Sequence, residues 1–243
     1  DLTKLTGLTP SNHGVIRLFN AGLDDYSIYA VDLPGHGKSD GKSKSSIDEY
    51  STDIIDFLDA MDLKKVCLVG HSMGAAIALN ASLSHHWRIC SAVAIGGASK
   101  MIVNHAILQG LQNTFEATVN SIVRYSWHKK TGAVAGSERM AAYFREKAKQ
   151  RMLDAGSKTV HGDFLACSNF DLSERLEEIG VPVLVIASDG DRMVPLKVSR
   201  EMAEKLPNAE FVSLENCGHF QHIEQTAKVA GELVTFLSKL RNT

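Results

Sequence analysis

The stretch VCLVGHSMGAAIAL, residues 66–79, decides the fold that this sequence predicts. It opens with four apolar residues, which match a short buried strand, and closes with an Ala-rich run that matches a helix. Between them stands GHSMG, residues 70–74, a G-x-S-x-G pattern. Glycines on both sides of a serine allow a sharp turn between strand and helix, with the serine hydroxyl exposed at the turn. The order of strand, glycine turn and helix therefore predicts a nucleophilic Ser72.

The composition excludes several classes of protein. The 243 residues are 44% hydrophobic and include 26 basic and 28 acidic side chains. This length and apolar share fit one large domain, with or without an insertion. The balanced charge gives no basic stripe for nucleic acid, and no run of about 18 apolar residues predicts a membrane span. We therefore expect a small-molecule partner, no nucleic acid and no membrane. Because no apolar signal peptide precedes the first strand, we expect a cytoplasmic protein.

Cysteine and histidine are spaced in ways that do not predict a metal site. The four cysteines are scattered without a C-x-x-C pair, which favours reduced thiols. The ten histidines show no H-E-x-x-H or similar ligand spacing. We therefore expect no metal and no cofactor. The composition does not predict an oligomeric state.

Apolar strand patterns alternate with helical patterns along much of the chain. Strands are expected at 26–31, 66–69, 90–95, 182–188 and 209–214, and helices at 46–61, 173–179, 199–206 and 225–240. This alternation predicts a mostly parallel sheet covered by helices on both faces, an α/β fold. The first 14 residues are polar and rich in turn formers, so no convincing strand is expected there, and a helix is expected at 11–23.

The alternation stops over residues 99–170. This block contains amphipathic helical patterns at 104–127 and a charged helical pattern at 137–153, with no good strand. Alternation resumes after residue 171. The sequence thus predicts a helical insertion between two parts of one core, 1–98 and 171–243.

Chemically useful residues follow three of the expected strands. Ser72 follows the first of them, Asp189 and Asp191 follow PVLVIAS, and His219 follows AEFVSL. The carboxyl ends of parallel strands meet at one edge of a sheet, so these side chains are expected close together. A histidine can accept the proton of a serine hydroxyl, and a carboxylate can orient that histidine.

The chain resembles the α/β-hydrolase fold superfamily. The motifs that carry the resemblance are DLPGHGKSD at 32–40, VGHSMG at 69–74, DGDRMVP at 189–195 and NCGHF at 216–220. The resemblance implies that Ser72 is the nucleophile, His219 the general base, and Asp191 the orienting carboxylate, with Asp189 as the alternative acid. It also implies that the helical insertion caps the site.

In that superfamily two backbone N–H groups stabilise the oxyanion. The resemblance assigns one to Met73, after the nucleophile, and the other to a residue after an early His-Gly pair. Spacing favours Leu8, preceded here by Thr6-Gly7, over the residue after His13-Gly14. The superfamily normally has two or three strands before this point, so N-terminal strands are expected to be missing from the given chain.

Several further residues have candidate roles. Trp127, Phe164 and Phe220 are candidates for the substrate pocket, although aromatic residues more often belong to a core. Other residues are expected to be structural: His36 and Asp32 in the glycine-rich loop, His71 beside the nucleophile, and His222 and Glu224 after His219.

The sequence therefore predicts a serine hydrolase that cleaves a small to medium carboxylic ester through an acyl-enzyme on Ser72. Because the nucleophile is Ser and not Asp, haloalkane dehalogenase and epoxide hydrolase chemistry is disfavoured. The same residues also serve thioesters, lactones, amides, C–C bonds and cofactor-free peroxidation, and the fold does not choose among them. A ligand-binding protein of the same fold with little turnover is the alternative from another class.

Overall fold

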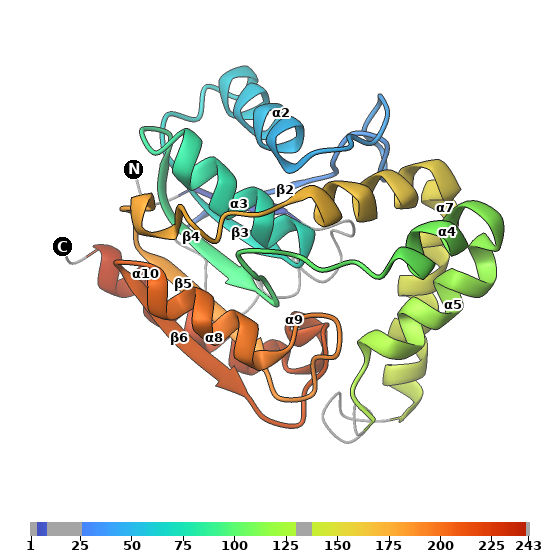
Figure 1. The fold of residues 1–243 in the computed structure, drawn as a ribbon. Helices are drawn as coiled ribbons and strands as arrows, with labels where there is room; N and C mark the ends of the chain where they lie inside the picture. Colours follow the sequence, from blue (N-terminus) through green and yellow to red (C-terminus); the bar gives the residue numbers. More distant parts are fainter. Residues whose placement is uncertain (1–3, 9–25, 130–137, 242–243) are drawn as a thin grey trace.

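A single parallel β-sheet forms the centre of the molecule (Figure 1). The computed structural model describes residues 4–8, 26–129 and 138–241. The strands are β1 (Lys4–Leu8), β2 (Ser27–Val31), β3 (Val66–His71), β4 (Ile89–Ile95), β5 (Val183–Ser188) and β6 (Ala209–Leu214). Their order is β2-β1-β3-β4-β5-β6, and every neighbouring pair is parallel. The predicted α/β fold with a parallel sheet is confirmed.

Helices cover both faces of this sheet (Figure 1). Leu68 of β3 packs in one cluster with residues of α2 (Ile47–Ala60), α3 (Met73–Ser84) and α8 (Leu196–Lys205). Its neighbour Val69 packs in a second cluster with α10 (Thr226–Arg241). Successive side chains of a strand point to opposite faces. Because both faces are covered, the strand reads as a continuous apolar run.

The N-terminal stretch differs from the prediction. Residues Lys4–Leu8, within the stretch where no strand was expected, form β1, a central strand between β2 and β3. Strand propensity is a weak guide where pairing partners lie on both sides, and backbone pairing here prevails over poor local propensity. The helix expected at 11–23 and the His13-Gly14 pair lie outside the described residues.

In the described part of the chain, three α-helices lie between β4 and β5. They are α4 (His105–Asn113), α5 (Phe115–Ser126) and α7 (Glu138–Asn169). Helix α7 continues well past residue 153, where the charged pattern was expected to end. Its axis breaks at Gly156, whose φ of 83° and ψ of 161° are not helical. This backbone region is open essentially only to glycine, so the break is encoded locally.

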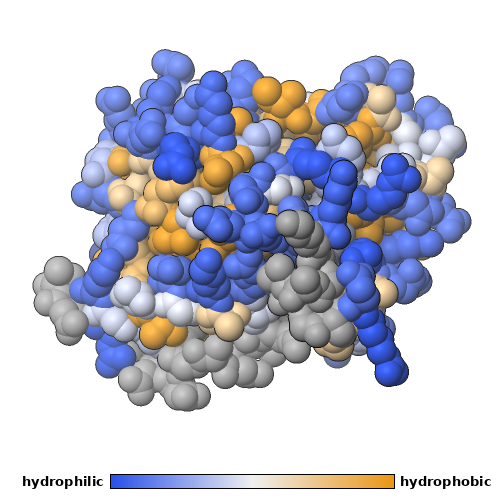
Figure 2. Space-filling view, turned by 90° about the horizontal axis from the view of Figure 1, so that it is seen from below, coloured by the Kyte–Doolittle hydropathy of each residue, from blue (hydrophilic) through white to orange (hydrophobic). Residues whose placement is uncertain are grey.

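Smaller differences concern short elements. The helix expected at 173–179 is only the short 3₁₀ helix η1 (Leu176–Glu178), and a short helix α9 (Gln221–Glu224) precedes α10. All four cysteines are free thiols. Within the described ranges, no helix combines the length and the apolar character that crossing a bilayer requires. Figure 2 shows one face of the molecule, on which hydrophilic residues predominate and hydrophobic residues gather in small patches.

Candidate active site

The turn after β3 holds Ser72 in a strained backbone conformation. Ser72 has φ 55° and ψ −115°, which an L-residue rarely adopts. A side chain at Gly70 would place its Cβ 2.0 Å from the carbonyl oxygen of Gly74, so only glycine fits there. The first turn of α3 thus lies directly against the end of β3. This close approach is the physical reason for the first glycine of the sequence pattern.

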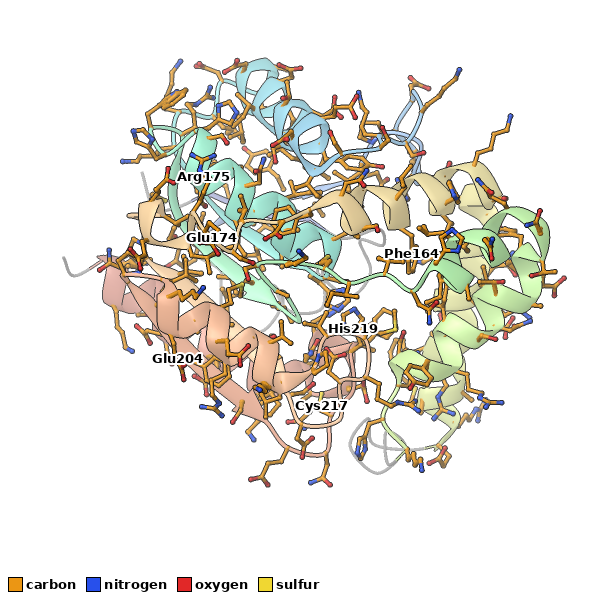
Figure 3. All side chains as sticks on the ribbon, viewed as in Figure 1. Phe164, Glu174, Arg175, Glu204, Cys217 and His219 are labelled. Carbon is orange, nitrogen blue, oxygen red and sulfur yellow. The ribbon has the colours of Figure 1, made fainter. Side chains whose placement is uncertain are left out.

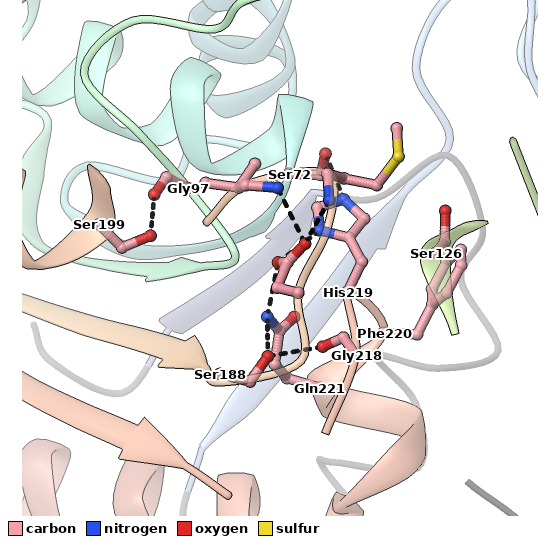
Figure 4. A network of polar contacts seen from close by, with 12 residues as sticks. Ser72, Gly97, Ser126, Ser188, Ser199, Gly218, His219, Phe220 and Gln221 are labelled. Atoms are coloured by element: carbon pink, nitrogen blue, oxygen red, sulfur yellow. Dashed lines mark hydrogen bonds and ion pairs between the residues drawn. The ribbon is translucent and has the colours of Figure 1, made fainter. Parts of the chain in front are cut away.

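Ser72, His219 and Asp191 form a continuous hydrogen-bonded series (Figure 4). The Oγ of Ser72 lies 2.9 Å from Nε2 of His219, and Nδ1 of His219 lies 2.8 Å from Oδ2 of Asp191. His219 and Asp191 are buried, with exposed fractions of 5% each. Asp191 can only accept at its ionised carboxylate, so Nδ1 of His219 carries a proton and Nε2 is free to accept one from Ser72.

The carboxylate of Asp191 is held by four donors in total. Besides His219, the backbone N–H groups of Met193 and Val194 each donate to Oδ1 at 2.8 Å, and Nε2 of Gln221 donates to Oδ2 at 3.1 Å. Donors of this kind stabilise the ionised form and fix its orientation. Asp189, the alternative acid, is exposed, and its Oδ1 accepts from the N–H of Cys217.

Gln221 was not singled out by the sequence. It also donates to Oγ of Ser188, which in turn donates to the carbonyl oxygen of Gly218 at 2.7 Å (Figure 4). Gln221 therefore links the end of β5 to the loop that contains His219. The only sequence signal for this role of Gln221 is its position two residues after His219.

A second group of contacts fixes the loop of His219. The buried carboxylate of Glu224 accepts from the backbone N–H groups of Gly218, Phe220 and His128 at 3.1, 3.3 and 3.2 Å. The N–H of His219 donates to the carbonyl oxygen of Ser126 at 2.7 Å. Glu224 thus has the local structural role expected for it, and it joins α9 to the end of α5.

Two more imidazoles pack beside His219 in their neutral form. Burial, with repulsion from His222 and His219, holds the pKa of His71 well below its usual value. Burial, with repulsion from His219, lowers the pKa of His222 to about 3. Nε2 of His71 lies 2.7 Å from the carbonyl oxygen of His219, so that nitrogen is the donor. Both rings pack against the loop that contains His219 or its neighbours, in the structural role expected from the sequence.

The two residues expected to stabilise an oxyanion lie at the same sheet edge as Ser72. Met73 is the first residue of α3, and the first N–H groups of a helix have no partner within the helix. Leu8 is the last residue of β1 and pairs with Gly70 of β3, two residues before Ser72. The strand β1 thus ends beside the turn.

A cavity of about 430 Å³ opens onto Ser72 and His219. Its lining is mostly apolar and comes from both the sheet side and the helical insertion. Phe164 and Phe220 line it as expected. Figure 3 shows Phe164 beside the helices of the insertion and His219 on the side of the sheet. Trp127 does not line it, which contradicts the prediction. Its ring instead stacks on the far side of Phe220, with centroids 4.9 Å apart.

One polar cluster joins the insertion to the core. Oδ2 of Asp163 on α7 lies 2.9 Å from Nε2 of His36, and its Oδ1 accepts from the hydroxyl of Tyr50 at 2.5 Å. Nδ1 of His36 lies 3.2 Å from the carbonyl oxygen of Pro34, so both ring nitrogens face acceptors. Burial lowers the pKa of His36, but the hydrogen bond and charge of Asp163 outweigh it and raise the pKa overall.

His36 is therefore more than a loop residue, because it lines the cavity and contacts the insertion. Asp32 organises the loop as expected, since its Oδ2 accepts from the N–H of Lys38 at 3.1 Å. The sequence analysis did not identify Asp163 as a candidate. The only sequence signal for it is the helical spacing that places it on one face with Val160, Phe164 and Cys167. Within the described part of the chain, no three His, Cys, Asp or Glu side chains gather in a way that could hold a metal ion.

This combination of a parallel sheet, a strained serine turn and a helical insertion defines a class of enzyme. Residues 5–226 match the family model of the alpha/beta hydrolase fold, and the chain belongs to that family. Its relatives are named hydrolases and esterases, and the protein is a hydrolase-family enzyme.

Two relatives and one solved structure illustrate the similarity. A 2-hydroxy-6-oxononadienedioate/2-hydroxy-6-oxononatrienedioate hydrolase of Paraburkholderia phymatum is 31% identical over 90% of this chain and 78% of its own length. A pimeloyl-acyl-carrier-protein methyl ester esterase of Vibrio atlanticus is 25% identical over 88% of this chain and 85% of its own. The enol-lactonase of Burkholderia xenovorans LB400 superposes with a TM-score of 0.87 at 17% identity, covering 98% of this chain and 92% of its own. The last similarity concerns the fold alone.

Proposed function

We propose that the protein is a serine hydrolase that cleaves a small to medium carboxylic ester through an acyl-enzyme on Ser72. The observation that carries this proposal is the hydrogen-bonded series from Ser72 through His219 to Asp191. A serine hydroxyl is a weak nucleophile, and a positioned imidazole that removes its proton makes the attack feasible.

The reaction would run in two halves. In the first, Oγ of Ser72 attacks the ester carbonyl while Nε2 of His219 takes the hydroxyl proton. The proton then passes to the leaving alkoxide, which departs as the alcohol. In the second half, His219 removes a proton from water, the resulting hydroxide attacks the acyl carbon, and the proton returns to Ser72 as the acid leaves. Asp191 keeps the imidazole oriented and stabilises its protonated form.

Two backbone N–H groups would stabilise the oxyanion in both halves. We assign them to Met73, at the beginning of α3, and to Leu8, at the end of β1. N–H groups aimed at a developing negative charge are typically worth about 3 kcal/mol each. The pairing of Leu8 with Gly70 supports this assignment, because it brings the end of β1 to the turn that contains Ser72.

The helical insertion would act as a cap over the site. We assign residues 99–170 to the cap and residues 1–98 and 171–243 to the core. Helices α4, α5 and α7 contribute apolar side chains to the cavity, among them Ile107, Ile122 and Phe164. A cavity of about 430 Å³ falls within the range for small-molecule sites, which supports a substrate of small to medium size.

A fluorophosphonate probe followed by peptide mapping tests the proposal. We expect stoichiometric labelling of Ser72 and none in Ser72→Ala, whose fold is checked by circular dichroism. A panel of p-nitrophenyl esters of increasing acyl length then sizes the pocket, with Ser72→Ala as the background control. If folded wild-type protein is not labelled and cleaves no ester, the hydrolase proposal is wrong and the ligand-binding alternative applies.

A further inference from the structure

The charged side chains that line the cavity are mostly positive. Among the described residues and apart from histidines, they are Lys100, Arg151, Arg192 and Asp163, which makes three cations and one anion. The single carboxylate already has two partners, His36 and Tyr50. An apolar cavity with an excess of positive charge favours an anionic ligand, because charge in a poorly hydrated site interacts strongly.

Two of the three cations are already engaged. Nζ of Lys100 forms an ion pair with Oδ2 of Asp171 at 2.7 Å. The guanidinium of Arg192 donates to the carbonyl oxygens of Arg124 and Trp127 and lies 4.2 Å from the centroid of the Tyr125 ring. These contacts hold both groups in place as parts of the protein.

Arg151 differs from the other two cations. It makes no hydrogen bond or ion pair with any residue that the structure describes. It is half-buried, and burial lowers the pKa of its guanidinium, opposed by the negative charge of Asp32. A guanidinium stays charged at neutral pH, so the half-buried Arg151, with only the longer-range charge of Asp32 acting on it, keeps its hydrogen-bond donors available for an anionic ligand.

The position of Arg151 on α7 directs it to the cavity. Ala148, Arg151, Met152 and Ala155 share one face of the helix, at the spacing i, i+3, i+4 and i+7, and all four line the cavity. After the break at Gly156, the second half of α7 presents Val160, Asp163, Phe164 and Cys167 in the same way. Arg151 thus lines the cavity from the helical insertion, together with the apolar side chains of the same helix face, whereas Ser72 lines it from the sheet side.

We propose that Arg151 binds a carboxylate at the far end of the substrate, so that the preferred substrates are esters that contain a free carboxylate. This inference rests on the proposed function and names its substrate class. A carboxylate suits the planar guanidinium, which can donate two parallel hydrogen bonds to it. A phosphate usually needs several donors, whereas one uncommitted cation matches a singly charged group.

Matched pairs of esters test this preference. Each pair consists of a monomethyl ester of an aliphatic dicarboxylic acid and the methyl alkanoate in which a methyl group replaces the carboxylate. A second series uses acetate esters of ω-hydroxy acids and of the corresponding alcohols. In at least one series we expect kcat/KM of the wild type to be about tenfold or more higher for the carboxylate form, mainly through KM. Equal kcat/KM within every pair would contradict the proposal.

Variants assign the preference to Arg151. In Arg151→Met, which keeps a long apolar stem, the ratio of kcat/KM within each pair should fall to about 1. Arg151→Lys should retain part of the ratio. Lys158→Met removes a positive charge from an exposed position on the same helix, away from the cavity lining, and should leave the ratio at the wild-type value. A ratio unchanged in Arg151→Met, or lost equally in Lys158→Met, would contradict the role of Arg151.

A binding measurement keeps this inference separate from the proposed function. The dissociation constant of monomethyl adipate is measured by calorimetry on Ser72→Ala and on Ser72→Ala/Arg151→Met, with methyl hexanoate as the neutral comparison. We expect the second substitution to weaken binding of the monoester about tenfold and to have a much smaller effect on methyl hexanoate. If the wild type cleaves no ester, this result still decides whether Arg151 binds a carboxylate.

Discussion

The two walls of the cavity are built in different ways. On the sheet side, polar groups are fixed by many hydrogen bonds, as the four donors to Asp191 illustrate. On the cap side, the wall is mostly apolar, and Asp163 and Lys100 are polar side chains of this wall that contact the core. A reacting geometry must be held within a fraction of an ångström, whereas an apolar wall can change with its ligand. Under the proposed function, the sheet side would determine the chemistry and the cap side would determine which substrates enter.

The largest expected effect concerns the acid on the sheet side. In Asp191→Asn an amide replaces the carboxylate, so the tautomer that His219 needs is no longer favoured, and we expect kcat to fall roughly 10⁴-fold. Asp189→Asn is the matched control, because Asp189 is exposed and does not contact His219, and its kcat should stay within about twofold. Steady-state kinetics with a p-nitrophenyl ester measures both. A larger loss in Asp189→Asn than in Asp191→Asn would reverse the assignment.

Glycine substitutions compare the rigidity of the two walls. Gly70→Ala places a Cβ 2.0 Å from a backbone oxygen that cannot move without α3, and should cost at least about 3 kcal/mol of stability. Gly156→Ala in the cap meets nothing within 4 Å but has φ +83°, so we expect about 2 kcal/mol of backbone strain. Gly180→Ala, which meets nothing within 4 Å, should stay within about 0.5 kcal/mol. Urea denaturation gives the three values, and an order other than Gly70, Gly156, Gly180 would contradict this comparison.

The stability contributed by the contact between His36 and Asp163, which joins the two walls, should depend on pH. His36 has a pKa raised above its ordinary 6.5, so its pairing with Asp163 stabilises the fold fully below that value and is lost as the pH rises through the raised pKa. Asp163→Asn should therefore cost about 1.5 kcal/mol at pH 6 and less at pH 8.5. Asp154→Asn, which alters an exposed carboxylate on the same helix, should show no such difference. A larger cost at pH 8.5 than at pH 6 for Asp163→Asn would contradict this pairing.

The smallest expected effect concerns the support of Asp191. Gln221→Leu removes one of four hydrogen bonds to that carboxylate, and we expect kcat to fall about fivefold, or about 1 kcal/mol. Gln225→Leu removes an exposed hydrogen bond to the carbonyl oxygen of Glu215 and serves as the control. Unchanged kcat in Gln221→Leu would show that the other three donors hold Asp191 without it.

The features predicted correctly from the sequence are those determined by residues that are close together in the chain. The turn at Ser72 follows from glycines within four residues of each other, and Asp191 and His219 lie three and five residues after the ends of β5 and β6. The break at Gly156 is also local, but it was not predicted, because a lone glycine in a helical pattern is usually tolerated.

Parts that depend on distant pairing were predicted poorly. The strand β1 contains Lys4, Thr6 and Gly7, and it forms because β2 and β3 pair with it on both sides. Trp127 was a candidate for the pocket although aromatic residues more often belong to a core, and its ring stacks on Phe220, which is 93 residues away in the chain. The clusters around Asp163 and Gln221 likewise join residues that are distant in the sequence.

The burial of the helix that follows Ser72 determines how the protein should lose activity on heating. Every residue of α3 from Met73 to Ser82 is buried, so this helix has no face that can separate from the fold while the rest stays intact. Its amide protons should exchange with deuterium only when the whole domain unfolds. Loss of the Ser72 geometry on heating should then coincide with global melting, and residual activity should report directly on the fraction of folded molecules.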